Sequence, residues 1–214
     1  CLTISSHGAL NYLGSNGGYF NSPNLSISYI NIKSNVISNI STTTQTRINT
    51  IPYYLFNGEN HYPDKNLIYK EYNKALNFYY ENCVDNFSFF QSKGYQIEYD
   101  NLKVNSIISN QSINIIQNNI ISFTLKNKNI IIHETNHQLL FNYPRILSII
   151  DEFITEQAKD ENYLLIGLID NLANQYDFNY EMKNMENNDI KLKLIFNNSQ
   201  SEINYHHSFL IKFN

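Results

Sequence analysis

The segment from about Tyr95 to Tyr143 constrains the fold most, because it consists of six short runs of residues with strand-like patterning. The runs are YQIEY, LKVNSII, SINIIQ, IISFTL, NIIIHE and HQLLFNY. Polar turn sequences separate them, including Asp100-Asn101, Asn118-Asn119 and Lys126-Asn127-Lys128. Short, evenly spaced strands with polar turns are typical of an antiparallel meander. We therefore predict such a meander here.

Helical patterns lie on both sides of this segment. Before it, Asp64 is a suitable N-cap for DKNLIYKEYNKALNFYYENCV, whose apolar residues recur at helical spacing. After it, Pro144 takes a favoured first-turn position in PRILSIIDEFITEQAKD, and we expect a further helix at 162–175. The chain ends in three expected strands, YDFNYEMK, IKLKLIF and HHSFLIKF. The order helix, sheet, helices, sheet predicts an α+β fold of antiparallel β-meanders alternating with helices.

The domain organisation follows from the same patterns. Residues 1–20 are expected to form a helix that ends in the glycine-rich turn GSNGGYF, which lacks the residues of a phosphate loop. Residues 21–60 form an extended segment rich in Ser, Thr and Asn, with IPYYLF as a short strand. Residues 61–214 form the α+β body, as one core or as two halves, 61–143 and 144–214.

Charge and hydropathy limit the classes of partner. The formal net charge is −4 and the 15 Lys and Arg residues are scattered, which argues against nucleic-acid binding. No apolar run approaches the roughly 20 residues that a transmembrane helix needs. The chain begins with Cys rather than Met, so we expect a signal peptide or membrane anchor upstream.

Cys1 and Cys83 are the only cysteines of the chain. We favour a disulfide between them, with a lipid on Cys1 or two free thiols as alternatives. The disulfide and the lipid both imply a location outside the cytoplasm. The N-x-S/T sequons permit glycosylation without indicating it; they begin at Asn24, Asn39, Asn86, Asn110 and Asn197.

Several short motifs along the chain form a recognisable set. They are Cys1, Ala9-Leu10, Gly14, Gly17-Gly18-Tyr19, Ile51-Pro52-Tyr53-Tyr54, Asn82-Cys83, GYQIEY at 94–99 and ITEQAKD at 154–160. In these motifs the chain resembles a family of membrane-anchored surface proteins of unknown function from small-genome archaea. The chain departs from the family at Asn16, where Gln is expected, and in residues 21–50, which have no obvious counterpart. The resemblance implies a single-pass anchor upstream and an extracytoplasmic body, and it brings no catalytic residues.

The sequence His133-Glu134-Thr135-Asn136-His137 fits the H-E-x-x-H pattern of zinc peptidases. In that alternative His133 and His137 bind zinc, Glu134 activates the bound water, and Glu156 is the third ligand. The two histidines must then lie one turn apart on a helix, yet NIIIHETNHQLLFN is rich in poor helix formers. In a strand they lie about 13 Å apart, too far for one ion. We therefore expect strand and turn here and keep the zinc site as the alternative.

Other candidate sites are weaker. His206 and His207 are adjacent on an expected strand and point to opposite faces, which we interpret as a surface edge. Asp151, Glu152 and Glu156 fit the solvated face of an amphipathic helix better than an acid–base pair. No recognisable catalytic nucleophile or cofactor motif is present, so we assign no catalytic residue and no cofactor.

We therefore expect a non-enzymatic structural or adhesion protein of the cell surface. Its expected partners are other protein subunits, with which it would self-assemble into a filament or another surface assembly. Residues 21–50 are a candidate for pairing with a neighbouring subunit's sheet edge. The alternatives are the zinc metallopeptidase and a lipid-anchored solute-binding protein with a pocket between two sheets.

Overall fold

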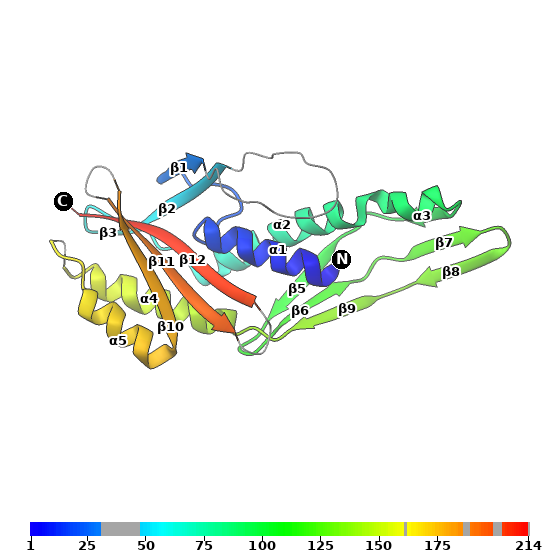
Figure 1. Ribbon diagram of the computed structural model, residues 1–214. Helices are drawn as coiled ribbons and strands as arrows, with labels where there is room; N and C mark the ends of the chain where they lie inside the picture. Colours follow the sequence, from blue (N-terminus) through cyan, green and yellow to red (C-terminus); the bar gives the residue numbers. More distant parts are fainter. Residues whose placement is uncertain (31–47, 161, 186–188, 199–202, 214) are drawn as a thin grey trace.

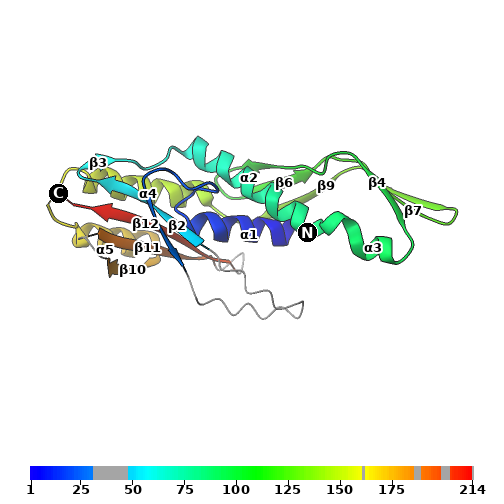
Figure 2. The same ribbon diagram turned by 90° about the horizontal axis from the view of Figure 1, so that it is seen from above.

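The computed structural model describes residues 1–30, 48–160, 162–185, 189–198 and 203–213. It confirms the α+β fold, with helices packed on largely antiparallel sheets. The molecule is elongated, with a body at one end and a narrow projection at the other (Figures 1 and 2). Among the described residues, no helix combines the length and apolar character needed to cross a membrane.

The body is built on one sheet with strand order β1-β2-β12-β11-β10, and a short β3 pairs with β2. Neighbouring strands are antiparallel except β12 and β2, which are parallel. The strands of this sheet are β1 (Ser26–Ile30), β2 (Ile48–Phe56), β3 (Glu59–Asn60), β10 (Phe178–Asn184), β11 (Asp189–Asn198) and β12 (Ile203–Lys212). The sheet therefore joins strands from the first third of the chain to strands from its end.

Helices cover the sheet and connect it to the projection (Figure 1). They are α1 (Leu2–Ser15), α2 (Lys65–Val84), a 3₁₀ turn η1 (Asp85–Phe87), α3 (Ser88–Ser92), α4 (Tyr143–Gln157) and α5 (Ile166–Tyr176). The predicted caps are present, because Asp64 accepts a hydrogen bond from the backbone N–H of Leu67 and Pro144 lies in the first turn of α4. One continuous core contains buried side chains from elements between α1 and β12. The two halves considered in the sequence analysis, 61–143 and 144–214, both contribute to this core.

The extended segment predicted for residues 21–60 is only partly described. Residues 31–47, with the sequon at Asn39, lie outside the described residues. On either side of them, β1 pairs with β2 of its own chain, and β2 lies inside the sheet with Ile51 and Tyr54 buried. β1 therefore pairs with a strand of its own chain. The subunit contact expected for residues 21–50 stays a prediction for residues 31–47.

The end of α1 fills a fork between β2 and β12. These two strands pair only near their C-terminal ends, at positions such as Leu210 with Tyr53. Where they are not paired, the Asn16 side chain accepts a hydrogen bond from the backbone N–H of Thr50, at 2.9 Å. A Cβ atom on Gly14 would lie 1.8 Å from the carbonyl oxygen of His206. The glycine-rich turn therefore allows a helix to approach strand backbone more closely than a side chain would permit.

Substitution of these glycines should destabilise the fold. We expect Gly14→Ala to lower the free energy of unfolding by about 1–3 kcal/mol or more, because the new methyl group overlaps the β12 backbone. Gly17→Ala should also be destabilising, since Gly17 has a φ of +54° and packs against Pro52. Urea denaturation measures both effects.

Gly167 provides the matched control, because it lies in α5 with open space around it. Gly167→Ala should be neutral or stabilising by up to about 1 kcal/mol. Equal effects of the substitutions at Gly14 and Gly167 would contradict the close contact between α1 and β12.

The predicted disulfide between Cys1 and Cys83 is confirmed, with Cα atoms 5.5 Å apart. It connects the beginning of α1 to the last turn of α2, so the two helices lie antiparallel beside each other. Because both sulfur atoms are in this bond, lipid attachment to the Cys1 thiol and a pair of free thiols are both excluded.

We expect the Cys1→Ser/Cys83→Ser double variant to lose roughly 2–5 kcal/mol of stability, because the bond closes a long loop in the unfolded chain. Urea denaturation with and without dithiothreitol measures the loss. The reductant should lower the wild-type midpoint and leave that of the double variant unchanged. A wild-type midpoint that does not respond under fully reducing conditions would contradict a stabilising role.

The predicted meander is confirmed, but it forms two sheets joined by an elbow. The sheet near the body has the order β5-β6-β9 and the distal sheet β4-β7-β8. The strands are β4 (Gln96–Tyr99), β5 (Val104–Ile108), β6 (Ile113–Gln117), β7 (Ile121–Leu125), β8 (Lys128–Ile132) and β9 (Thr135–Leu139). Since β4 leads into β5, β6 into β7 and β8 into β9, the same three chain segments build both sheets. We call η1, α3 and the distal sheet the arm (85–99 and 121–132), which is the projection in Figures 1 and 2.

Asn119 holds the elbow where ladder pairing is interrupted. Its side-chain oxygen accepts from the backbone N–H of Lys103, and its side-chain nitrogen donates to the carbonyl of Asn101, both at 2.9 Å. Asn101 has a φ of 21°. One side chain thus satisfies two backbone groups that the strands leave unpaired at the bend.

Candidate functional sites

The HETNH segment lies at the elbow, in the outer chain segment of the meander. His133 and Glu134 are exposed in the link between β8 and β9, and His137 is in β9, opposite Ile115 of β6. The expectation of strand and turn is confirmed. Because the required helix is not formed, the two histidines do not share a helical turn.

Glu156, the third residue of the zinc alternative, lies in the last turn of α4 and forms an ion pair with Lys159. Within the described part of the chain, no three His, Cys, Asp or Glu side chains gather in a way that could hold a metal ion. The set His133, His137 and Glu156 with Glu134 as base is therefore not assembled. The alternative is wrong in its geometry because the local sequence favours strand pairing over a helix.

His137 has a structural environment instead. It lies close enough to His7 of α1 to influence its titration: burial lowers the pKa of His7, and His137 lowers it further. α1 and β9 are in contact. The second histidine of the motif thus belongs to the interface between the first helix and the meander.

His206 and His207 lie on opposite faces of β12, as predicted, but the prediction of a surface edge is wrong. β12 is an interior strand, between β2 and β11, and His207 is 0% exposed. His206 is half-buried and shares a hydrogen bond with the Ser15 hydroxyl at 2.7 Å. The sequence suggested an edge because nothing in it places β2 beside the last strand.

His207 is the centre of a buried chain of hydrogen bonds. The Tyr54 hydroxyl donates to the carbonyl of Gly17 at 2.9 Å, so it accepts from His207 Nε2, which is 2.6 Å away. His207 Nδ1 lies within hydrogen-bond distance of the Tyr205 hydroxyl, at 2.8 Å. The Tyr205 hydroxyl in turn lies 3.5 Å from that of Tyr143. The imidazole thus carries a proton on Nε2 and connects β12, β2 and the glycine-rich turn.

Burial controls the titration of this network. Burial lowers the pKa of His207 to about 3, with a smaller effect from His206. Burial also raises the pKa values of Tyr54 and Tyr205 well above their ordinary value. The network has neutral members and is closed to solvent, which suits a structural role better than proton transfer to a substrate. Sequence reasoning missed it, although the Ile51-Pro52-Tyr53-Tyr54 element marked one of its members.

The His207 network makes stability depend on pH. A histidine with pKa 6.5 when unfolded and about 3 when folded binds more protons in the unfolded state. Its contribution is therefore fully present above pH 6.5 and is lost as the pH falls toward 3, by about 1.4 kcal/mol per pH unit. Between pH 6.5 and 4.5, unfolding free energies of His207→Gln should fall less steeply than those of the wild type. Parallel curves for the two proteins would contradict a neutral, buried His207.

Glu71 is a second buried polar group that the sequence did not single out. Burial by itself would raise its pKa, but hydrogen bonds from Lys74 and from the backbone N–H groups of Asn21 and Phe20 outweigh it and lower the pKa. Glu71 thus holds the segment after α1 against α2. In the sequence it is indistinguishable from a solvated helix residue beside a lysine.

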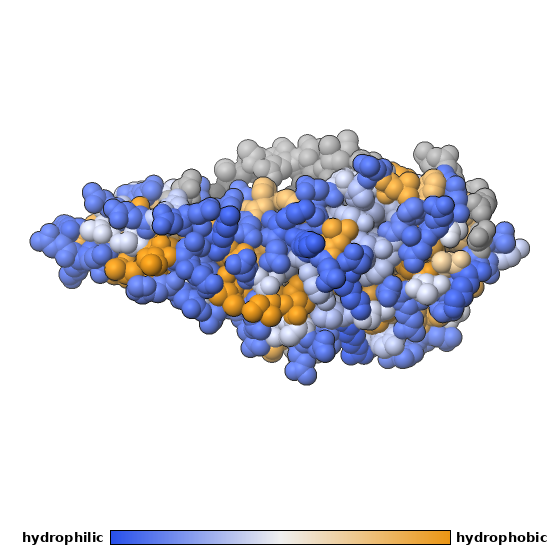
Figure 3. All heavy atoms as spheres, turned by 180° about the vertical axis from the view of Figure 1, so that it is seen from behind, coloured by the Kyte–Doolittle hydropathy of each residue, from blue (hydrophilic) through white to orange (hydrophobic). Residues whose placement is uncertain are grey.

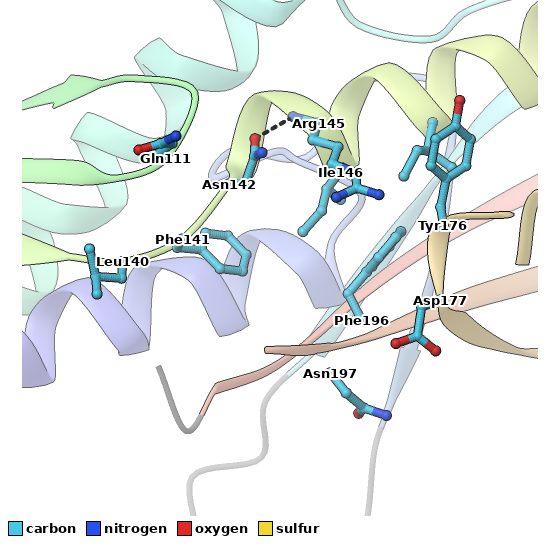
Figure 4. A pocket seen from close by; sticks show the side chains of 11 residues that line it. Gln111, Leu140, Phe141, Asn142, Arg145, Ile146, Tyr176, Asp177, Phe196 and Asn197 are labelled. Carbon is cyan, nitrogen blue, oxygen red and sulfur yellow. Dashed lines mark hydrogen bonds between the residues drawn. The ribbon is translucent and has the colours of Figure 1, made fainter. Parts of the chain in front are cut away.

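An open cleft lies between the body and the meander (Figure 4). Its volume is about 470 Å³, and it is lined by Gln111, Leu140, Phe141, Asn142, Arg145, Ile146, Ile149, Tyr176, Asp177, Phe196 and Asn197. Phe141 and Phe196 form a buried apolar floor. The Arg145 guanidinium lies over the ring of Tyr176, 5.5 Å from its centroid. The solute-binding alternative expected a pocket between two sheets, whereas α4 and the end of α5 also line this cleft. The lipid on the Cys1 thiol that this alternative requires is excluded by the disulfide.

The arm has an incompletely covered apolar surface. Phe123 packs against Phe87 and Phe90, and its register partner in β8 is Ile130. Ile130 therefore continues the apolar face beyond the cover of α3. The exposed fractions are 65% for Phe89, 58% for Ile130, 48% for Ile131 and 41% for Phe90. Figure 3 shows apolar residues grouped on this tapered end.

The outer edge of β8 is also free in the described chain, where β8 pairs with β7 alone. An edge strand presents unpaired N–H and C=O groups that can pair with another chain. Exposed apolar side chains beside such an edge mark a contact surface. The sequence contained the NIIIHE strand but gave no indication that it projects from the body.

No protein-family model, curated protein or solved structure matches this chain. The resemblance to membrane-anchored archaeal surface proteins therefore stays a prediction.

Proposed function

We propose that this protein is a non-enzymatic structural or adhesion subunit of the cell surface that self-assembles through its arm. The observation that carries the proposal is the projecting arm, with exposed Phe89 and Ile130 and an edge of β8 that the described residues leave unpaired. A free apolar surface of this kind is costly to expose to water and is stabilised when another protein covers it.

The disulfide supports an extracytoplasmic location. Bonds such as Cys1–Cys83 persist in oxidising compartments and are rare in the cytosol.

Substitutions on the arm test the proposal. Ile130→Ser and Phe89→Ser should each weaken self-association about tenfold or more, because burial of such a side chain contributes roughly 1.5–3 kcal/mol. Sedimentation velocity across a wide range of concentrations measures the association of wild type and variants.

Ile4→Ser is the matched control, because Ile4 is 69% exposed on α1, outside the arm. It should leave association unchanged, and circular dichroism should show all variants folded. A wild type that stays monomeric at every concentration, or a control that weakens association as much as the arm variants, would refute assembly through the arm.

A further inference from the structure

The arm tip carries positive charge in a protein whose net charge is negative. Segments 88–97 and 121–132 contain Lys93, Lys126 and Lys128 and no acidic residue, whereas the whole chain has a formal charge of −4. The two acidic residues of the arm, Asp85 and Glu98, lie just outside these segments. In the described part of the chain, none of the three lysines forms an ion pair with a carboxylate. Lys93 lies over the exposed ring of Phe89, 5.8 Å from its centroid. The tip therefore combines unpaired cations with exposed apolar side chains.

The face formed by α4 and α5 has the opposite charge. Residues 144–177 contain seven acidic and two basic residues. Of the two bases, Lys159 is paired with Glu156 and Arg145 lies on Tyr176. We call this the α4–α5 face; its exposed carboxylates are Asp151, Glu152, Asp170 and Asp177. Exposed apolar side chains are also present at this end of the body, with Tyr163 at 73% and Ile166 at 46%.

The two charged regions lie at opposite ends of the molecule. In both Figure 1 and Figure 2, the arm extends to one side of the body and α5 lies toward the other end. A contact of tip with tip would bring lysines together, and a contact of two α4–α5 faces would bring carboxylates together; both are unfavourable. Contact of tip with α4–α5 face pairs opposite charges and covers apolar side chains on both partners.

From this arrangement we infer that the arm tip of one copy docks on the α4–α5 face of the next copy. The inference rests on the proposed self-assembly and names its partner surface. Such a contact is heterologous, because it joins two different surfaces, and each added copy leaves a tip and a face free. The resulting assembly is an open-ended filament whose stability falls with salt.

Charge-reversal variants test the inference. The tip variant is Lys126→Glu/Lys128→Glu, and the face variant is Asp151→Lys/Glu152→Lys. Each alone should weaken association about a hundredfold or more, since like charges then meet in the contact. A mixture of the two should form an alternating polymer, because the basic tip of the face variant can dock on the acidic face of the tip variant, and the acidic tip of the tip variant can dock on the basic face of the face variant. A chain carrying both sets of substitutions should polymerise again.

Lys70→Glu and Glu81→Lys are matched controls, because both residues are exposed on α2. They should polymerise like the wild type in sedimentation velocity. A wild type that is monomeric throughout would overturn the proposed function together with this inference. Two results would overturn the head-to-tail contact alone. In the first, the wild type polymerises while the mixture of the two variants stays monomeric. In the second, the wild type polymerises and each variant by itself forms a closed dimer.

Vesicles distinguish a lipid partner from a second copy. The wild type and the tip variant should bind equally weakly to vesicles of phosphatidylcholine with phosphatidylglycerol in co-sedimentation. Strong binding by a monomeric wild type that the tip variant loses would show that the tip recognises an anionic membrane, and would overturn docking on a second copy.

Discussion

The fold depends on the insertion of the end of α1 between β2 and β12. These strands come from the beginning and the end of the chain, and their direct pairing is short. Asn16 satisfies the backbone of β2, while the absence of a side chain at Gly14 lets the helix approach β12. His207 completes the link through Tyr54 to the carbonyl of Gly17. Backbone groups that would be left without partners in the fork are thereby satisfied by one turn of the chain.

The arm follows different physical rules from the body. In the body, buried aromatic residues and the disulfide hold helices and sheet around one core. In the arm, a thin sheet is covered by a short helix on one side only, so apolar residues such as Phe89 and Ile130 remain exposed. The bend at Asn119 separates the two regions. An incompletely covered apolar projection is suited to contacts between molecules.

In the proposed assembly, the charge distribution gives the contacts a direction. Overall, the chain is mildly acidic, but its arm tip is basic and its α4–α5 face is acidic. A net charge alone conceals this separation, because it sums over both ends of the molecule. Electrostatic complementarity of this kind selects partner surfaces and orientation more than it adds affinity, and the apolar side chains at both ends supply the area that such a contact would bury.

Much of the architecture was determined by local sequence. Periodicity predicted the meander, and the residue types at Asp64 and Pro144 predicted where α2 and α4 begin. Helix propensity favoured strand over helix for HETNH. These preferences depend on neighbours in the chain, so they can be read from the sequence. The two cysteines made the disulfide the favoured prediction, while a lipid on Cys1 and free thiols stayed open as alternatives until the structure placed both sulfur atoms together. Only the tertiary structure decided that β2 lies beside β12, that His207 is buried, that the meander bends into an arm, and that basic and acidic surfaces lie at opposite ends. Those features depend on contacts between residues far apart in the sequence, which no local pattern specifies.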